Sequence, residues 1–150
     1  MKRYLLYGMI LAATLAMPVK RTDVGKLQPI QTVAVYITDK GSTMQTDTGD
    51  VGVGETVALA IENLEQTTVG VVYLDTAEYL LISEGEETVA EELKATFKNS
   101  VELYWVQGEP NLKSASQFLS AHGNGPTFKS WEKGVKLPLL VCKNDRMILQ

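Results

Sequence analysis

The sequence predicts an α+β fold in which a mixed β-sheet of about four strands carries three packed helices. The chain has 150 residues, 45% of them hydrophobic and 21% charged, which fits one folded domain rather than a disordered chain. Runs rich in β-branched residues are interleaved with segments whose apolar residues recur at helical spacing. The expected order is β-β-α-β-α-β-α followed by a terminal hairpin. Strands joined through helices tend to be parallel with right-handed crossovers.

The first third of the predicted domain is a hairpin followed by a helix. Residues 30–38 ("IQTVAVYIT") alternate apolar and polar side chains, as a half-buried strand does, and the chain returns as a second strand over residues 43–48. Residues 55–66 ("ETVALAIENLEQ") predict an amphipathic helix packed on the sheet. Its inner face is expected to hold Val57, Ile61 and Leu64.

A strand, a polar break and a second helix are expected next. Residues 71–73 and 79–82 are strand-like, and residues 75–77, in which Asp75 and Thr76 can hydrogen-bond the backbone, separate them. Ser83 and Glu86 have the spacing of a capping box. Val89, Leu93 and Phe97 repeat every four residues behind it and predict the second helix.

The last third is predicted to contain a strand, a third helix and a hairpin. Residues 101–107 ("VELYWVQ") form the strand, whose Tyr104 and Trp105 are expected in the core, and Pro110 suits the first turn of a helix. Gly123 is expected to end that helix. Its inner face is predicted to hold Leu112, Ala115 and Leu119, and a terminal hairpin should occupy residues 137–150.

The amino-terminal residues indicate export. Lys2 and Arg3 precede the apolar run of residues 4–19, which is shorter than the roughly 20 residues that span a bilayer. We therefore expect a signal peptide or short signal anchor at residues 1–19, a tether at 20–29 and a single domain at 30–150. The protein would be extracytoplasmic, with residues 4–19 available to hold it at the membrane.

The charges are distributed unevenly along the chain. Twelve acidic residues and no Lys or Arg occur between Gly41 and Leu93. Nucleic-acid binding draws on clustered Lys and Arg, so that partner is not expected. Glu62 and Glu65 flank the apolar stripe of the first helix, and Glu91 and Glu92 that of the second. These four carboxylates are the candidate surface for docking a basic protein partner, and a merely solubilising face is the other interpretation.

Two overlapping patterns in residues 47–56 suggest sites, and both fail on chemistry. Gly49 to Thr56 matches a phosphate-binding loop except that Glu55 stands where lysine must neutralise the phosphates. Asp47-Thr48-Gly49 has the letters of an aspartic protease but lacks the apolar lead of its buried loop. Neither nucleotide binding nor proteolysis is expected. If the protein bound a small ligand or catalysed a hydrolysis, Asp47, Asp50 and Asp75 would be the candidate residues.

Other catalytic and metal arrangements find little support. The chain has one histidine, His122, and one cysteine, Cys142, so neither an internal disulfide nor a zinc site of these residues can form. His122 is near Ser116 and Ser120 in sequence, but no orienting acid or oxyanion hole is identified. We expect no catalytic residue, no metal and no cofactor, and hence no enzyme.

The pattern of elements resembles the amino-terminal domain of the Ger(x)C family, the membrane-anchored C subunits of nutrient germinant receptors in endospore-forming bacteria. The similar stretches are "VYITDKG", "ETVALAIENLEQTT", "GVVYLDTAEYLLISEG" and "VELYWVQGEPNLKSASQFL", between about Lys20 and His122. The chain lacks a lipid-acceptor cysteine after its apolar run. The resemblance implies an exported, non-enzymatic accessory or assembly domain on a membrane complex, and it assigns no site residue.

Overall fold

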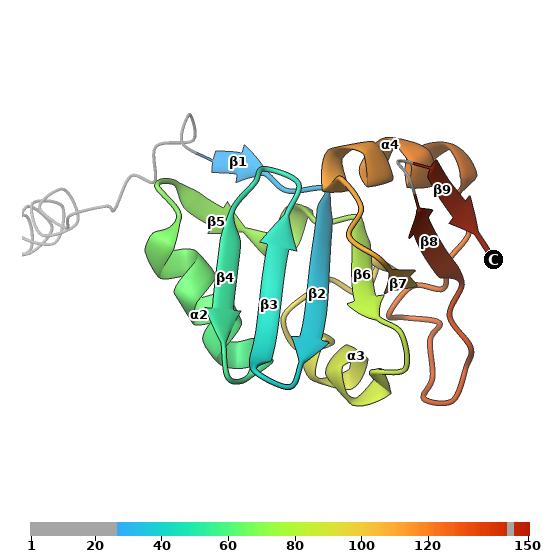
Figure 1. Ribbon diagram of the computed structural model, residues 1–150, viewed down its shortest axis with the longest axis horizontal. Helices are drawn as coiled ribbons and strands as arrows, with labels where there is room; N and C mark the ends of the chain where they lie inside the picture. The colour runs from blue at the N-terminus through green and yellow to red at the C-terminus, as the bar shows by residue number, and fades with distance from the viewer. Residues whose placement is uncertain (1–26, 144–145) are drawn as a thin grey trace, which may run out of the picture.

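A computed structural model describes residues 27–143 and 146–150. Its centre is a seven-stranded mixed sheet in the order β4-β3-β2-β6-β7-β8-β9 (Figure 1). The four central strands are parallel, whereas β3, β4 and β9 pair antiparallel with their neighbours. The strands are β2 (Thr32–Thr38), β3 (Gly41–Thr46), β4 (Val51–Gly54), β6 (Tyr79–Ser83), β7 (Glu102–Gln107), β8 (Leu139–Lys143) and β9 (Arg146–Leu149).

The predicted α+β class, the mixed sheet and the three helices are confirmed, but the count of about four strands is wrong. The terminal hairpin, β8 and β9, is not an appendage, because β8 pairs in parallel with β7 and extends the sheet. The strand β4 was not expected at all. Glycine is unfavourable in strands, so the sequence "VGVG" does not predict one.

Glycines occupy β4 because a helix lies directly against that strand. A Cβ atom on Gly52 would meet the Ala60 carbonyl oxygen at 2.1 Å, and one on Gly54 would meet the Ala60 nitrogen at 2.5 Å. Both residues belong to the face of β4 that contacts α2 (Val57–Thr67). A close approach of two backbones is a recognised reason for glycine inside a strand. The glycine-rich stretch is therefore an edge strand packed under a helix.

Helices cover both faces of the sheet. On one face, α2 and α3 (Glu87–Leu93) pack over a single large core. Residues 123–138, which follow α4 and which we call the covering segment, pack over the same core. On the other face, α4 (Leu112–His122) packs over a second core. The first core includes Val33, Val35, Met44, Leu64, Leu80, Ile82, Leu93, Phe128 and Trp131, and the second includes Ala34, Leu81, Tyr104, Val106, Ala115 and Leu119.

A small parallel sheet lies beside the main one. It consists of β1 (Leu27–Pro29) and β5 (Val71–Tyr73), so the end of the expected tether, residues 27–29, is a strand. The short 3₁₀ helix Leu74–Thr76 follows β5, and its Thr76 hydroxyl donates to the Ile30 carbonyl at 2.9 Å and accepts from the Ile30 amide at 2.9 Å. The expected role of Thr76 in fixing this break is confirmed. The proposed signal or anchor at residues 1–19, and residues 20–26 of the tether, lie outside the described residues.

The helices begin slightly later than predicted, at Val57, Glu87 and Leu112. Thr56 caps α2 by accepting from the Leu59 amide, and Asn111 caps α4 by accepting from the Ser114 amide. The capping box at Ser83 is wrong, because its hydroxyl donates to the Val35 carbonyl and accepts from the Ile37 amide, both on β2. Pro110 precedes the cap of α4 rather than lying in its first turn.

The Tyr104 side chain links β7 to the covering segment. The Tyr104 hydroxyl donates to the Glu102 carboxylate at 2.5 Å and accepts from the Gly125 amide at 2.7 Å. Burial, and then the bond to Glu102, raise the pKa of Tyr104 above its ordinary value. Phe128 and Trp131 are buried in the first core, so they cover the sheet.

No helix within residues 27–143 and 146–150 is both long and apolar enough to span a bilayer.

Candidate functional site

The four candidate docking carboxylates are exposed on the same side of the sheet. Glu62 and Glu65 lie on α2, and Glu91 and Glu92 lie on α3. Both helices bury their inner residues in the same core, which places them on one face of the sheet. We call these four residues the acidic helix side.

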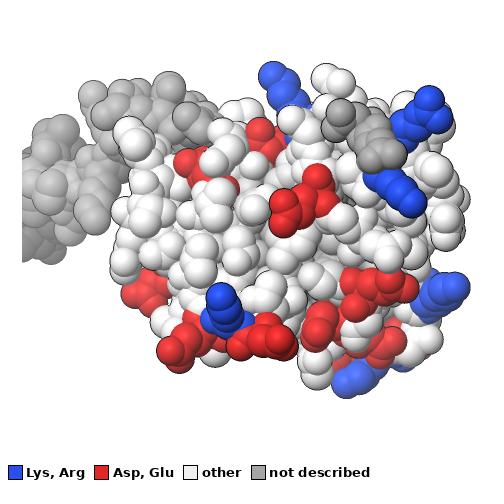
Figure 2. All heavy atoms as spheres, in the orientation of Figure 1, with Lys and Arg blue, Asp and Glu red and all other residues white. Residues whose placement is uncertain are grey.

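The two helices differ in their electrostatic surroundings. Glu91 forms an ion pair with Lys133 of the covering segment at 3.3 Å, and Lys94 and Lys98 follow α3 directly. By contrast, no Lys or Arg occurs from Gly41 to Leu93, so α2 carries carboxylates alone. In Figure 2 most of the Lys and Arg atoms lie over the right-hand half of the view, and one basic side chain lies at the lower left beside acidic ones. The cations near α3 therefore offset part of its negative charge, whereas residues 41–67 supply none to α2.

Asp47 and Asp50 belong to one tight turn between β3 and β4. The Asp47 carboxylate accepts from the Gln31 amide at 3.2 Å, which ties the turn to the start of β2. The Thr48 hydroxyl donates to the Asp50 carboxylate at 2.8 Å, and Gly49 has a φ of 94°, a value that favours glycine. The carboxylates thus serve the turn itself.

Asp75 is not part of this turn. It lies in the 3₁₀ helix after β5 and is exposed. A cavity of about 400 Å³ beside the turn is lined by Asp47, by Lys113 and by the cap residue Asn111, but by neither Asp50 nor Asp75. Within the described ranges, no three His, Cys, Asp or Glu residues are grouped so that they could hold a metal ion. The three aspartates proposed for a ligand are therefore not gathered around one cavity.

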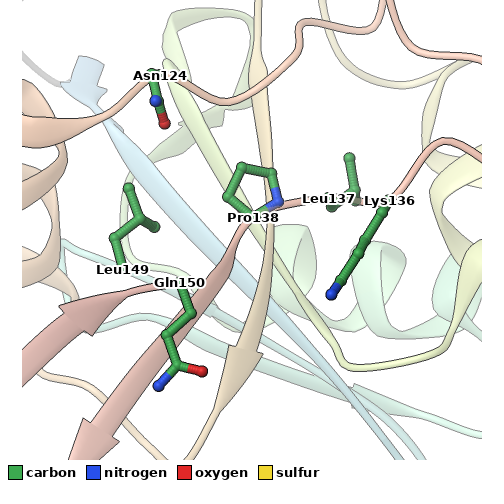
Figure 3. Close-up of a pocket in the computed structure, with 6 residues that line it drawn as sticks. All are labelled: Asn124, Lys136, Leu137, Pro138, Leu149 and Gln150. Carbon is green, nitrogen blue, oxygen red and sulfur yellow. The ribbon is translucent and has the colours of Figure 1, made fainter.

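A second cavity of about 400 Å³ lies where the covering segment meets β9. Figure 3 shows Asn124, Lys136, Leu137, Pro138, Leu149 and Gln150 around it. Its polar groups are one ammonium and two side-chain amides. Such a set can hydrogen-bond a small anion but offers no nucleophile with a base beside it.

The other reactive side chains have structural partners. The buried Ser116 hydroxyl donates to the Gln31 side chain at 3.0 Å, which links α4 to the start of β2. The His122 ring stacks on Phe118 with a centroid separation of 4.8 Å, and its Nδ1 is 3.1 Å from the Phe118 carbonyl oxygen. Cys142 is half-buried. Ser116 and His122 are therefore engaged in packing rather than with each other.

The exposed flank of β4 and α2 is the feature that the sequence reading missed. A groove of about 520 Å³ runs along this edge of the sheet, and it is lined by Val53, Gly54, Glu55, Leu59, Glu62, Asn63 and Gln66. The signal that could have revealed it is the alternation of "VGVG", which places two valines on one face and two glycines on the other.

Searches of known protein families, of curated proteins and of solved structures found no match to the chain.

Proposed function

We propose that this protein is an exported, membrane-associated interaction domain without enzymatic activity, which docks a basic protein partner through its acidic helix side. Its role would be that of an accessory or assembly subunit on a membrane complex, as the Ger(x)C resemblance implies. The apolar run of residues 4–19 would deliver it to the membrane.

The observation that carries this proposal is that the stretch containing α2 has carboxylates and no Lys or Arg. Glu62 and Glu65 are exposed, and the stretch that contains them has no Lys or Arg to neutralise them. Such a field accelerates association with a basic partner and disfavours an acidic one. The side chains that could support catalysis are instead engaged in turns and packing.

Partner capture by cross-linking from membranes of the source organism tests the proposal. Capture should weaken as salt rises, because the Debye length is only about 8 Å at physiological ionic strength. Replacing Glu62 and Glu65 by Gln should weaken it about threefold to tenfold, since each exposed ion pair contributes about 0.2–1 kcal/mol. The Glu91→Gln/Glu92→Gln pair should have a smaller effect, because Lys133 already offsets part of that charge.

A matched control replaces Glu78 and Glu109 by Gln, which removes the same charge away from the two helices. Capture that is indifferent to salt and to all four helix substitutions would contradict the proposal. The acidic helix side would then only solubilise the protein.

The alternative function is a small-ligand or hydrolytic site at residues 47–56. The cavity beside Asp47 and Lys113 favours it, because a carboxylate and an ammonium line the same hollow. Replacing Asp47, Asp50 and Asp75 by Asn separates the two functions. A ligand-binding or catalytic protein should lose its activity while remaining folded, whereas the docking domain should keep its partner.

A further inference from the structure

The apolar residues left on the surface are concentrated at one end of the sheet. Eight large hydrophobic residues are exposed among those described, and six of them lie on β4, on α2 or in the stretch from Val69 to β5. They are Val51, Val53, Leu59, Val69, Val71 and Tyr73. Exposed apolar surface that gathers beside charged residues is typical of an interaction site.

The backbone of β4 is also open on this side. Thr46 donates to the Asp50 carbonyl at 3.0 Å, so this pair is a hydrogen-bonded position of the antiparallel β3–β4 ladder. Such positions alternate, so Gly52 and Gly54 bond to β3 while Val51 and Val53 direct their amides and carbonyls to the outside. The Val53 amide donates to the Asn63 side chain at 3.0 Å, which agrees with this direction. An edge of this kind can pair with another strand.

The two faces of such an added strand would meet different chemistry. Gly52 and Gly54 face α2, so Val51 and Val53 point to the opposite face of the sheet. On the α2 side, the groove beside the edge presents Glu55 and Glu62. Alternate residues of an incoming strand would therefore lie beside valines on one face and beside carboxylates on the other.

We propose that the β4 edge binds an extended segment of a partner protein in which basic and apolar residues alternate, and which adds to the sheet as an eighth strand. This inference rests on the proposed function and specifies where and in what conformation the basic partner docks. Charge complementarity selects this occupant. A second copy pairing edge to edge would bring Glu55 and Glu62 against like charges.

Asn63 would regulate access to this edge. Its side-chain oxygen occupies the place that a carbonyl of the incoming strand would take at the Val53 amide. The partner must displace that contact or pair only with the remaining groups of Val51 and Val53. This residue also protects the free protein, because covered edges are less prone to pair with the wrong chain.

A labelled peptide of about eight residues that alternates Lys and Val is the probe. Fluorescence anisotropy with the full chain should show binding that weakens as salt rises. A peptide with Glu in place of Lys should not bind, and one with the same residues in two blocks should bind more weakly. The Glu55→Gln/Glu62→Gln variant should lose affinity about threefold to tenfold, and the Glu91→Gln/Glu92→Gln variant should change it less than twofold.

Two backbone variants distinguish strand pairing from general attraction. Val51→Pro removes an outward amide without touching the β3–β4 ladder and should abolish most binding. Asn63→Ala frees the Val53 amide and should strengthen binding. Circular dichroism and melting curves establish that each variant is folded. If Val51→Pro does not fold, the Asn63→Ala variant alone distinguishes strand pairing from general attraction.

Two sets of results would overturn the inference. Absence of binding by the alternating peptide, or binding that ignores both Val51→Pro and Asn63→Ala, would exclude strand addition at β4. Partner capture that depends on Glu62 and Glu65 would still support the proposed function in that case. Self-association that the Val51→Pro variant abolishes, measured by sedimentation, would make a second copy the occupant instead.

Discussion

The side-chain oxygen of Asn63 accepts a hydrogen bond from the Val53 amide, joining α2 to the outer edge of β4 at 3.0 Å. The helix thereby satisfies a backbone donor that points away from β3. The contact is possible only because glycine lets α2 lie directly on the strand. The helix, the strand and the edge groove are thus one packed unit.

Replacing Gly52 by Ala should destabilise the protein. The new methyl group would lie 2.1 Å from the Ala60 carbonyl oxygen, which belongs to the backbone and cannot rotate away. Overpacking of this kind costs about 1–3 kcal/mol of unfolding free energy. Urea unfolding measures it. The control is Val53→Ala, an exposed change that should stay within about 0.5 kcal/mol. Equal costs for the two variants would refute the close contact between α2 and β4.

Stability should fall as the pH rises from about 10 to about 12. Burial raises the pKa of Tyr36 to about 12, and the charges of Glu109 and Cys142 add to this shift. The folded protein therefore holds this proton over a range in which the unfolded chain, with a pKa near 10, has lost it. Stabilisation is complete below pH 10 and is lost as the pH approaches 12.

The Tyr36→Phe variant isolates this contribution. It should show a shallower loss of stability across that range, although Tyr104 and Tyr79, whose pKa values are also raised, still contribute. Near neutral pH the variant should be about as stable as the parent, because the buried Tyr36 hydroxyl has no hydrogen-bond partner among the described residues. Denaturation at several pH values measures both effects. Parallel curves for the parent and the variant would contradict this assignment.

Millimolar ATP with magnesium should leave the melting temperature unchanged. A ligand that binds the folded state must raise that temperature by mass action. Glu55 stands where a phosphate-binding loop has lysine, and residues 51–54 are the strand β4 rather than a loop. The Glu55→Lys variant restores the missing cation and should still show no shift, since its backbone cannot cradle phosphates. A rise of several degrees in either protein would show that nucleotide binds.

Periodicity determined much of the fold in advance. Helical spacing identified the inner faces of α2 and α4, β-branched residues located β2, and short apolar runs located β6 and β7. These signals are local, because a side chain's position along a helix or strand depends on its neighbours in sequence. The sequence likewise placed twelve carboxylates in one stretch, and it predicts that no phosphate loop forms at Glu55.

Local signals failed where a contact came from a distant part of the chain. Ser83 has the spacing of a capping residue, but it bonds to Val35 and Ile37 because β6 lies beside β2. The aspartates 47, 50 and 75 could be proposed as one site from composition alone. The structure divides them between a turn and a 3₁₀ helix.

The sequence by itself determined the class of fold, the helical faces and the sign of the charge. Tertiary structure alone decided that residues 51–54 form an edge strand, that the terminal hairpin extends the sheet and that Lys133 reaches Glu91. The physical reason is that strand pairing and ion pairing depend on which segments meet after folding. The glycines of β4 are explained by the close packing of α2, which leaves no room for a Cβ atom at Gly52 or Gly54.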